Sequence, residues 1–137
     1  MIITYPTIPS NDDFEILKQG LNGFNEMHTG HLEKETIASF IKNDNQQIVG
    51  GVLGEIKWGW LHVHGLWVAP NYQAKGYGTQ LLKTLEDYAV EKGIPRFRLE
   101  TTSFQALPFY QKLGYDIFGE LSDLPPGYVS YFLQKRI

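Results

Sequence analysis

The sequence predicts a single α/β domain in which a β-sheet is flanked by helices. The chain has 137 residues, close to the commonest size of one domain, and 42% of them are hydrophobic, enough for a core. Runs of β-branched and aromatic residues predict several strands. Residues 79–92, between two such runs, carry apolar side chains at helical spacing. We therefore expect one domain over residues 1–137.

The N-terminal segment predicts a short strand followed by helices. Residues 2–4 are apolar, and Ser10 precedes acidic residues, which is typical of a helix N-cap. Gly20 and Gly23 interrupt the helical pattern that follows. We expect two short helices there, and then a loop or short helix over residues 25–35.

Two strands are predicted next, over residues 36–42 and 47–57, because both segments are rich in β-branched and aromatic side chains. The Asn-Asp-Asn cluster at 43–45 is suited to a hairpin turn between them. The two strands are therefore expected to pair antiparallel.

A third strand is predicted over residues 60–68, and it carries two histidines. Successive side chains of a strand point to opposite faces. Strict alternation places His62 and His64 on one face, together with Leu66 and Val68. We expect the two histidines to lie side by side.

The C-terminal half predicts a helix over 79–92, a strand over 97–101 and a short helix over 105–113. A final hairpin is predicted from residues 115–121 and 128–134, joined by a Pro-Pro-Gly turn. Strand, loop, helix and strand therefore follow one another in the middle of the chain.

Composition excludes several classes of function. Twelve basic residues against fifteen acidic ones give a net charge of −3, without the basic stripe that nucleic-acid binding requires. No apolar stretch reaches the length of a membrane span, and the start lacks a signal-peptide pattern, so we expect a soluble cytoplasmic protein. The absence of cysteine excludes a cysteine-bound acyl intermediate. No metal is expected, because the histidine pairs lack supporting ligands at suitable spacing.

The most informative segment is the glycine loop QAKGYG, residues 73–78, between a strand and a helix. Glycines allow close backbone approach, and the N–H groups at the start of a helix favour a phosphate group. The loop therefore predicts a pyrophosphate site, although two glycines alone can simply form a tight turn.

Two other phosphate-binding loops match this segment less well. A P-loop requires Lys followed by Ser or Thr after the last glycine, and Tyr77-Gly78-Thr79 provides no such Lys. A dinucleotide-binding loop is closer, because Glu100 follows about twenty residues later. Its third glycine position is Leu81, however, and residues 69–75 separate the strand from the first glycine.

Two segments at the right separation resemble the signatures of the GNAT N-acyltransferases. VAPNYQAKGYGTQLL is similar to their acetyl-CoA-binding segment, whose pattern Q/R-x-x-G-x-G/A is filled by Gln73, Gly76 and Gly78. FYQKLGY, residues 109–115, is similar to their second signature. The resemblance covers residues 50–137. It implies a mixed, mostly antiparallel sheet with one splayed pair of parallel strands, and transfer of an acetyl group from acetyl-CoA to an amine.

The resemblance also implies where acetyl-CoA binds. The cofactor would lie between the splayed strands, with the backbone of Leu66 and Val68 pairing with pantetheine and the N–H of Val68 stabilising the oxyanion. Ser103 stands where many relatives carry Asn, so the cofactor contact there is open. The residues expected to line the pyrophosphate are Gln73, Ala74, Lys75, Gly76, Tyr77, Gly78 and Thr79.

Tyr110 corresponds to the family's tyrosine that protonates the departing thiolate. A direct transfer also needs a group that takes a proton from the acceptor amine. His62 stands where many relatives have a carboxylate, and we prefer it to the neighbouring His64 as the base. Glu100, a water chain or no dedicated base are the alternatives.

An aromatic wall is expected to bind the acceptor, for which we expect a small molecule rather than a protein. The same side chains suit a homodimer surface. A non-catalytic acyl-CoA-binding module and a nucleotide-dependent enzyme are the competing functions. The residues of the expected wall are Phe24, Trp58, Trp60, Phe104 and Tyr128.

Overall fold

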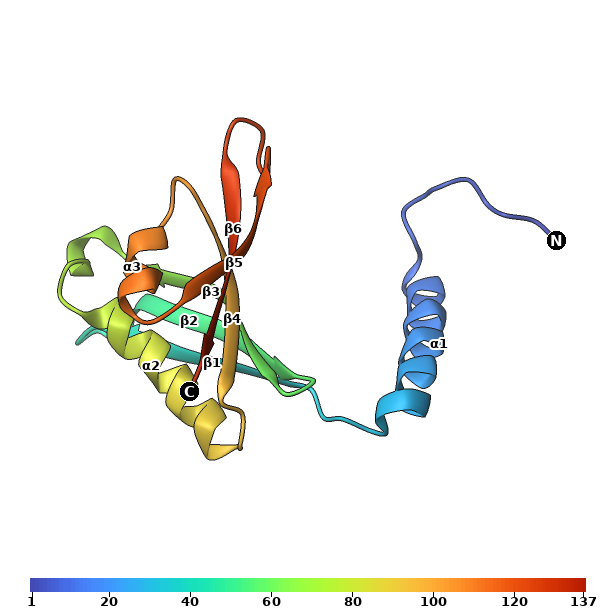
Figure 1. Cartoon of the computed structure of the whole chain (residues 1–137), viewed down its shortest axis with the longest axis horizontal. Helices are drawn as coiled ribbons and strands as arrows, with labels where there is room; N and C mark the ends of the chain where they lie inside the picture. Colours follow the sequence, from blue (N-terminus) through green and yellow to red (C-terminus); the bar gives the residue numbers. More distant parts are fainter. The chain divides into compact units, whose positions relative to one another are not determined.

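The computed structural model describes residues 1–137, which divide into two compact units, Met1–Leu32 and Glu33–Ile137 (Figure 1). The expectation that residues 1–137 form one domain stays a prediction. None of the helices is long and apolar enough to cross a membrane.

The N-terminal unit contains one helix, α1 (Asn11–Thr29). The side chain of Ser10 accepts a hydrogen bond from the N–H of Asp13 at 3.1 Å, which confirms the predicted N-cap. The predicted strand over residues 2–4 is wrong, since a strand needs a partner and this unit contains no other. The predicted break at Gly20 and Gly23 is also wrong, because each glycine costs a helix only about 1 kcal/mol.

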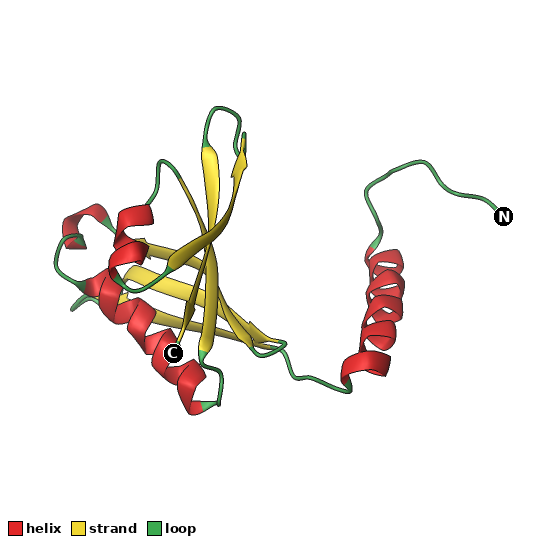
Figure 2. Ribbon diagram, viewed as in Figure 1, coloured by secondary structure: helices red, strands yellow, loops and turns green.

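The C-terminal unit is a six-stranded sheet in the order β1-β2-β3-β4-β6-β5, with helices between strands (Figure 2). All neighbouring strands are antiparallel except β3 and β4, which are parallel. The expected mixed sheet is therefore confirmed. Its elements are β1 (Glu35–Lys42), β2 (Ile48–Lys57), β3 (Trp60–Val68), the short 3₁₀ helix η1 (Pro70–Tyr72), α2 (Tyr77–Glu91), β4 (Arg96–Thr102), α3 (Leu107–Lys112), β5 (Asp116–Ser122) and β6 (Val129–Arg136).

The turn between β1 and β2 forms where the asparagine cluster predicts it. The side-chain oxygen of Asn43 accepts hydrogen bonds from the N–H groups of Asn45 at 2.9 Å and Gln47 at 3.0 Å. These bonds close the loop without help from the rest of the fold. The first hairpin is thus specified locally.

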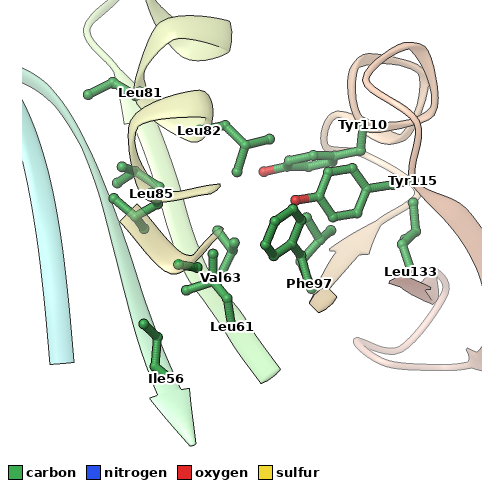
Figure 3. Close-up of a cluster of buried hydrophobic side chains, with 13 residues drawn as sticks. Ile56, Leu61, Val63, Leu81, Leu82, Leu85, Phe97, Tyr110, Tyr115 and Leu133 are labelled. Atoms are coloured by element: carbon green, nitrogen blue, oxygen red, sulfur yellow. The ribbon is translucent and has the colours of Figure 1, made fainter. Parts of the chain in front are cut away.

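Helices α2 and α3 lie on the same side of the sheet, and the core lies between them and the strands (Figures 2 and 3). The predicted apolar stripe of α2 is confirmed, since four of its members are buried and Tyr88 is partly buried against the core. Three of them, Leu81, Leu82 and Leu85, are labelled in Figure 3, where Leu82 lies nearest Tyr110. This side of the sheet is called the inner face, and the opposite side the outer face.

The parallel strands β3 and β4 pair over a short distance only. Their ladder runs from Leu61 opposite Phe97 to Val63 opposite Leu99, and β3 continues beyond it to Val68. The C-terminal part of β3 is therefore free of β4, which confirms the expected splay.

A β-bulge interrupts β3 at the start of this free part. Leu53 of β2 pairs with Gly65, and the next residue of β2, Gly54, pairs with Val63. His64 is left without a partner as the extra residue of the bulge.

The bulge overturns the predicted faces of β3. Strict alternation placed His62 and His64 on the same face as Leu66 and Val68. Leu66 and Val68 instead pack against the core on the inner face, as the extra residue shifts the alternation by one. The histidines lie on the outer face, which they share with the exposed Trp67.

Candidate active site

The glycine loop leads directly into α2. Gly76 is the N-cap of this helix with φ of +83°, a backbone conformation that side chains disfavour, and Ala74 also has positive φ. The first backbone bond of the helix is donated by Gln80 to the carbonyl of Gly76. The N–H groups of residues 77–79 therefore have no partner within the helix, and they form the kind of site that binds phosphate oxygens.

A pocket of about 520 Å³ opens at this point, a volume within the usual range of small-molecule sites. Its walls come from the end of β3, from the loop and first turn of α2, and from the start of α3. The lining residues are Leu66, Val68, Tyr72, Gln73, Ala74, Gly76, Tyr77, Gly78, Thr79, Ala106 and Phe109. Eight of the predicted cofactor-binding residues are therefore brought together.

The free part of β3 offers backbone donors beside this pocket. The N–H of Ala69 bonds the carbonyl of Val49 in β2 at 2.8 Å. Successive N–H groups of a strand point to opposite edges, so those of Leu66 and Val68 point away from β2. They point toward the β4 edge, where pairing with β4 has already ended at Val63. The predicted backbone donors are thus available.

Gln73 anchors the loop to β3. Its side-chain amide donates a hydrogen bond of 2.8 Å to the carbonyl of Val68. The carbonyl of Val68 therefore already has a hydrogen-bond partner within the protein. The side chain of Gln73 fixes the position of the glycine loop against β3. Gly78 also has a packing role, since a Cβ there would lie 3.3 Å from the ring of Phe109.

Two predicted cofactor residues, Lys75 and Ser103, do not line the pocket. The ammonium group of Lys75 lies 5.9 Å from the centre of the Tyr72 ring. The hydroxyl of Ser103 accepts a hydrogen bond from the N–H of Val129 at 3.2 Å, which ties the end of β4 to β6. The structure shows no pocket contact for either side chain.

His62 and His64 are brought together on the outer face, with ring centres 4.1 Å apart. His62 lies between Glu55 of β2 and Arg98 of β4 in the strand register. Burial, the Arg98 guanidinium and His64 lower the pKa of His62 to about 4, against an opposing effect of Glu55. His62 is therefore neutral at neutral pH, and it is a weak proton acceptor.

Tyr110 is part of the core cluster and is 8% exposed. Its ring contacts Phe109, which lines the pocket, at a centre-to-centre distance of 5.1 Å. Burial raises the pKa of Tyr110, so its phenol stays protonated through the neutral range, the form that an acid needs. Figure 3 shows its hydroxyl directed toward Leu82 of α2.

Within the C-terminal unit, the residues of the predicted aromatic wall lie in two separate groups. Trp58 and Trp60 lie at the start of β3, where the guanidinium of Arg136 lies 4.8 Å from the Trp60 ring centre. The ring centres of Phe104 and Tyr128 are 4.9 Å apart. These two residues lie beyond the C-terminal end of β4, whereas the tryptophans lie near the N-terminal end of the parallel strand β3. Phe24 belongs to the N-terminal unit, where its ring contacts His28.

Sequence reasoning missed the pocket residues Tyr72, Ala106 and Phe109, and it missed Arg98 beside His62. The sequence contained a signal for Phe109, because this residue directly precedes Tyr110 in the second signature. For Arg98 there was none, because its place depends on the register between two strands. No three His, Asp or Glu side chains lie close enough together to hold a metal ion.

Comparisons with known proteins agree with this geometry. The model of the acetyltransferase (GNAT) family matches residues 7–115. The blasticidin-S acetyltransferase of Streptomyces morookaense is 36% identical over 104 residues, which cover 75% of this chain and 76% of that protein. Acetyltransferase Atu2258 of Agrobacterium fabrum is 28% identical over 88% of both chains. The crystal structure of an acetyltransferase from Bacillus cereus superimposes with a TM-score of 0.87 at 32% identity, over 98% of both chains.

The chain belongs to the acetyltransferase (GNAT) family, and it is an enzyme of that class. The resemblance seen in the two sequence signatures is thereby confirmed. Members of this family use acetyl-CoA as the acyl donor.

Proposed function

We propose that this enzyme transfers an acetyl group directly from acetyl-CoA to a primary amine of a small molecule. The observation that carries the proposal is the pocket at the start of α2, where unpaired N–H groups of the helix meet the free end of β3. The pyrophosphate would bind the N–H groups of residues 77–79, and pantetheine would follow the backbone of Leu66 and Val68.

The amine nitrogen attacks the thioester carbonyl carbon, and the C–S bond then breaks. The N–H of Val68 stabilises the oxyanion that forms between these events. Tyr110 protonates the departing CoA thiolate, a role supported by its place behind the pocket residue Phe109. The nucleophilic amine loses one proton in the transfer, so proton gain and loss balance.

His64 accepts that proton. It is exposed at the bulge, whereas the lowered pKa of His62 makes His62 a weak proton acceptor, contrary to our preference from the sequence. His62 would support the neighbouring imidazole through their contact at 4.1 Å. Register and burial support this division of roles, which strand alternation alone would not suggest.

The acceptor body would lie on the outer face beside the histidines. Phe40, Leu53 and Trp67 are exposed on this face. The ring of Phe40 covers Gly51, since a Cβ at Gly51 would come within 2.7 Å of it, and Gly51 pairs with Trp67. These apolar side chains suit the body of an organic amine.

The similarity to blasticidin-S acetyltransferase makes blasticidin S the first acceptor to test. Purified enzyme is incubated with acetyl-CoA and, separately, with blasticidin S, a polyamine, an aminoglycoside, a free amino acid and a peptide with a free N-terminus. Free CoA is quantified, and the acetylated product is identified by mass spectrometry. We expect acetylation of at least one small molecule at a primary amine. Acetylation of the peptide alone, or CoA release without an acetylated amine, would contradict the proposal.

A further inference from the structure

A buried carboxylate links α2 to the segment that follows α3. Glu86 of α2 is 8% exposed, and its two oxygens accept hydrogen bonds from the Tyr115 hydroxyl at 2.6 Å and the Lys135 ammonium at 3.1 Å. A buried charge costs free energy unless it is well paired, and apolar residues can often replace such a group without loss of stability. Core packing alone therefore does not account for a carboxylate here.

Tyr115 brings this network into contact with Tyr110. Their ring centres are 6.0 Å apart with the planes at 72°, and the N–H of Tyr115 donates to the carbonyl of Tyr110 at 3.1 Å. Figure 3 shows the two rings side by side, with both hydroxyls directed toward α2. The Lys135 ammonium lies 5.6 Å from the Tyr115 ring centre.

Apolar packing holds a ring in place, but it is not directional, whereas a hydrogen bond at 2.6 Å fixes the position of the phenol oxygen. Tyr115 is 1% exposed and is bonded at both ends, by its hydroxyl and by its backbone N–H. It consequently forms a rigid wall on one side of the Tyr110 ring.

We propose that Glu86, acting through Tyr115, is a positioning residue that holds the Tyr110 phenol in the orientation needed to protonate the CoA thiolate. The inference rests on the proposed function of Tyr110 as the acid. Lys135 completes the network by pairing with the second carboxylate oxygen. None of these three residues lines the proposed acetyl-CoA pocket.

The test is a double-mutant cycle of Tyr115→Phe and Tyr110→Phe. Activity is measured with acetyl-CoA and the small-molecule amine of highest turnover in the panel above, and also as hydrolysis of acetyl-CoA without an amine. We expect Tyr115→Phe to lower kcat by about tenfold, as for a modest misplacement of a catalytic group, with an unchanged KM for acetyl-CoA. In the Tyr110→Phe background the same change should have no further effect, because the group that it positions is gone.

Tyr88→Phe is the matched control. Tyr88 of α2 is also a tyrosine whose hydroxyl donates a hydrogen bond to a carboxylate, that of Glu35, and this bond is separate from the Glu86 network. It should leave kcat unchanged. Glu86→Gln keeps an oxygen acceptor for Tyr115 and should retain most of kcat, whereas Glu86→Leu should lose as much as Tyr115→Phe.

The possible failures are distinguishable. If Tyr110→Phe leaves kcat unchanged, the acid assignment fails, and the positioning role fails with it. If Tyr110→Phe lowers kcat but the losses in kcat from the two substitutions multiply in the double variant, the network is merely structural. The same conclusion holds if Tyr115→Phe raises KM instead of lowering kcat. Either result overturns this inference alone. Should Tyr115→Phe fail to fold, the Glu86→Gln and Glu86→Leu pair decides: equal kcat values in these two variants contradict the proposal.

Discussion

The two faces of the sheet are built by different means. On the inner face the pocket is formed by the backbone of β3, by the loop before α2 and by small residues such as Gly76. On the outer face His62 lies in a row with Glu55 and Arg98, which come from two other strands, and His64 lies beside it at the bulge. In the proposed mechanism, acetyl-CoA binding on the inner face depends on backbone shape, whereas acceptor chemistry on the outer face depends on side chains. Substitutions on the two faces should therefore have different effects.

The largest effect on turnover is expected from the loss of the Tyr110 hydroxyl, the proposed acid. Tyr110→Phe removes only a hydroxyl, so the core and acetyl-CoA binding should be preserved. We expect kcat to fall by about 10² to 10⁴-fold, the usual contribution of a positioned acid. Steady-state kinetics with the identified acceptor measure this, and thermal unfolding serves as the control for the fold.

The histidine pair should show an unequal division of labour. His64→Gln is expected to lower kcat/KM by about 10²-fold, because it removes the proton acceptor. His62→Gln should cost less, because the low pKa of His62 leaves it a supporting role. Rates measured for both variants across pH decide the point, and equal losses would contradict the assignment of His64 as the base.

The loop before α2 should affect binding rather than chemistry. Gly76 has φ of +83°, and no atom lies within 4 Å of a Cβ placed there, so Gly76→Val strains the backbone without a clash. Strain of this kind costs about 1–3 kcal/mol, which corresponds to a loss of about 5-fold to 150-fold in acetyl-CoA affinity if the loop shifts to relieve it. Calorimetric titration of the variant with acetyl-CoA checks this value.

The smallest effect concerns stability and pH. The pKa of His62 is lowered from 6.5 to about 4 in the fold, so the unfolded chain binds a proton at higher pH than the folded one. Stability should therefore fall as the pH decreases from 6.5 toward 4, by about 1 kcal/mol or less after allowance for solvent screening of the partly exposed ring. Denaturant unfolding at several pH values should show this slope weakened in His62→Gln. An unaltered slope in His62→Gln would show that other groups cause the pH dependence of stability.

The elements that could be predicted from the sequence are those specified by local signals. The Asn43 turn, the α2 stripe and the glycine loop each depend on residues that are close in the chain. All six strands of the sheet were predicted to within two residues at each end. The splay of β3 and β4 came from the family resemblance.

The features that were missed depend on contacts between distant segments. The bulge at His64 arises from the register between β2 and β3, and no residue pattern within β3 predicts it. It moved Leu66 and Val68 to the inner face. Trp60 and Phe104 of the predicted aromatic wall are separated for a similar reason, because composition does not reveal that they lie at opposite ends of parallel strands. Register therefore decides which side chains meet.

The central claim is that the donor site on the inner face and the histidines on the outer face have separate roles. The most direct test is the Kd of acetyl-CoA, measured by calorimetry for the parent, for Gly76→Val and for the double variant His62→Gln with His64→Gln. We predict that Gly76→Val binds acetyl-CoA at least about fivefold more weakly, while the histidine variant binds it as the parent does although its kcat/KM falls by about 10²-fold or more. If the histidine variant loses acetyl-CoA affinity and Gly76→Val retains it, the assignment of the two faces is wrong.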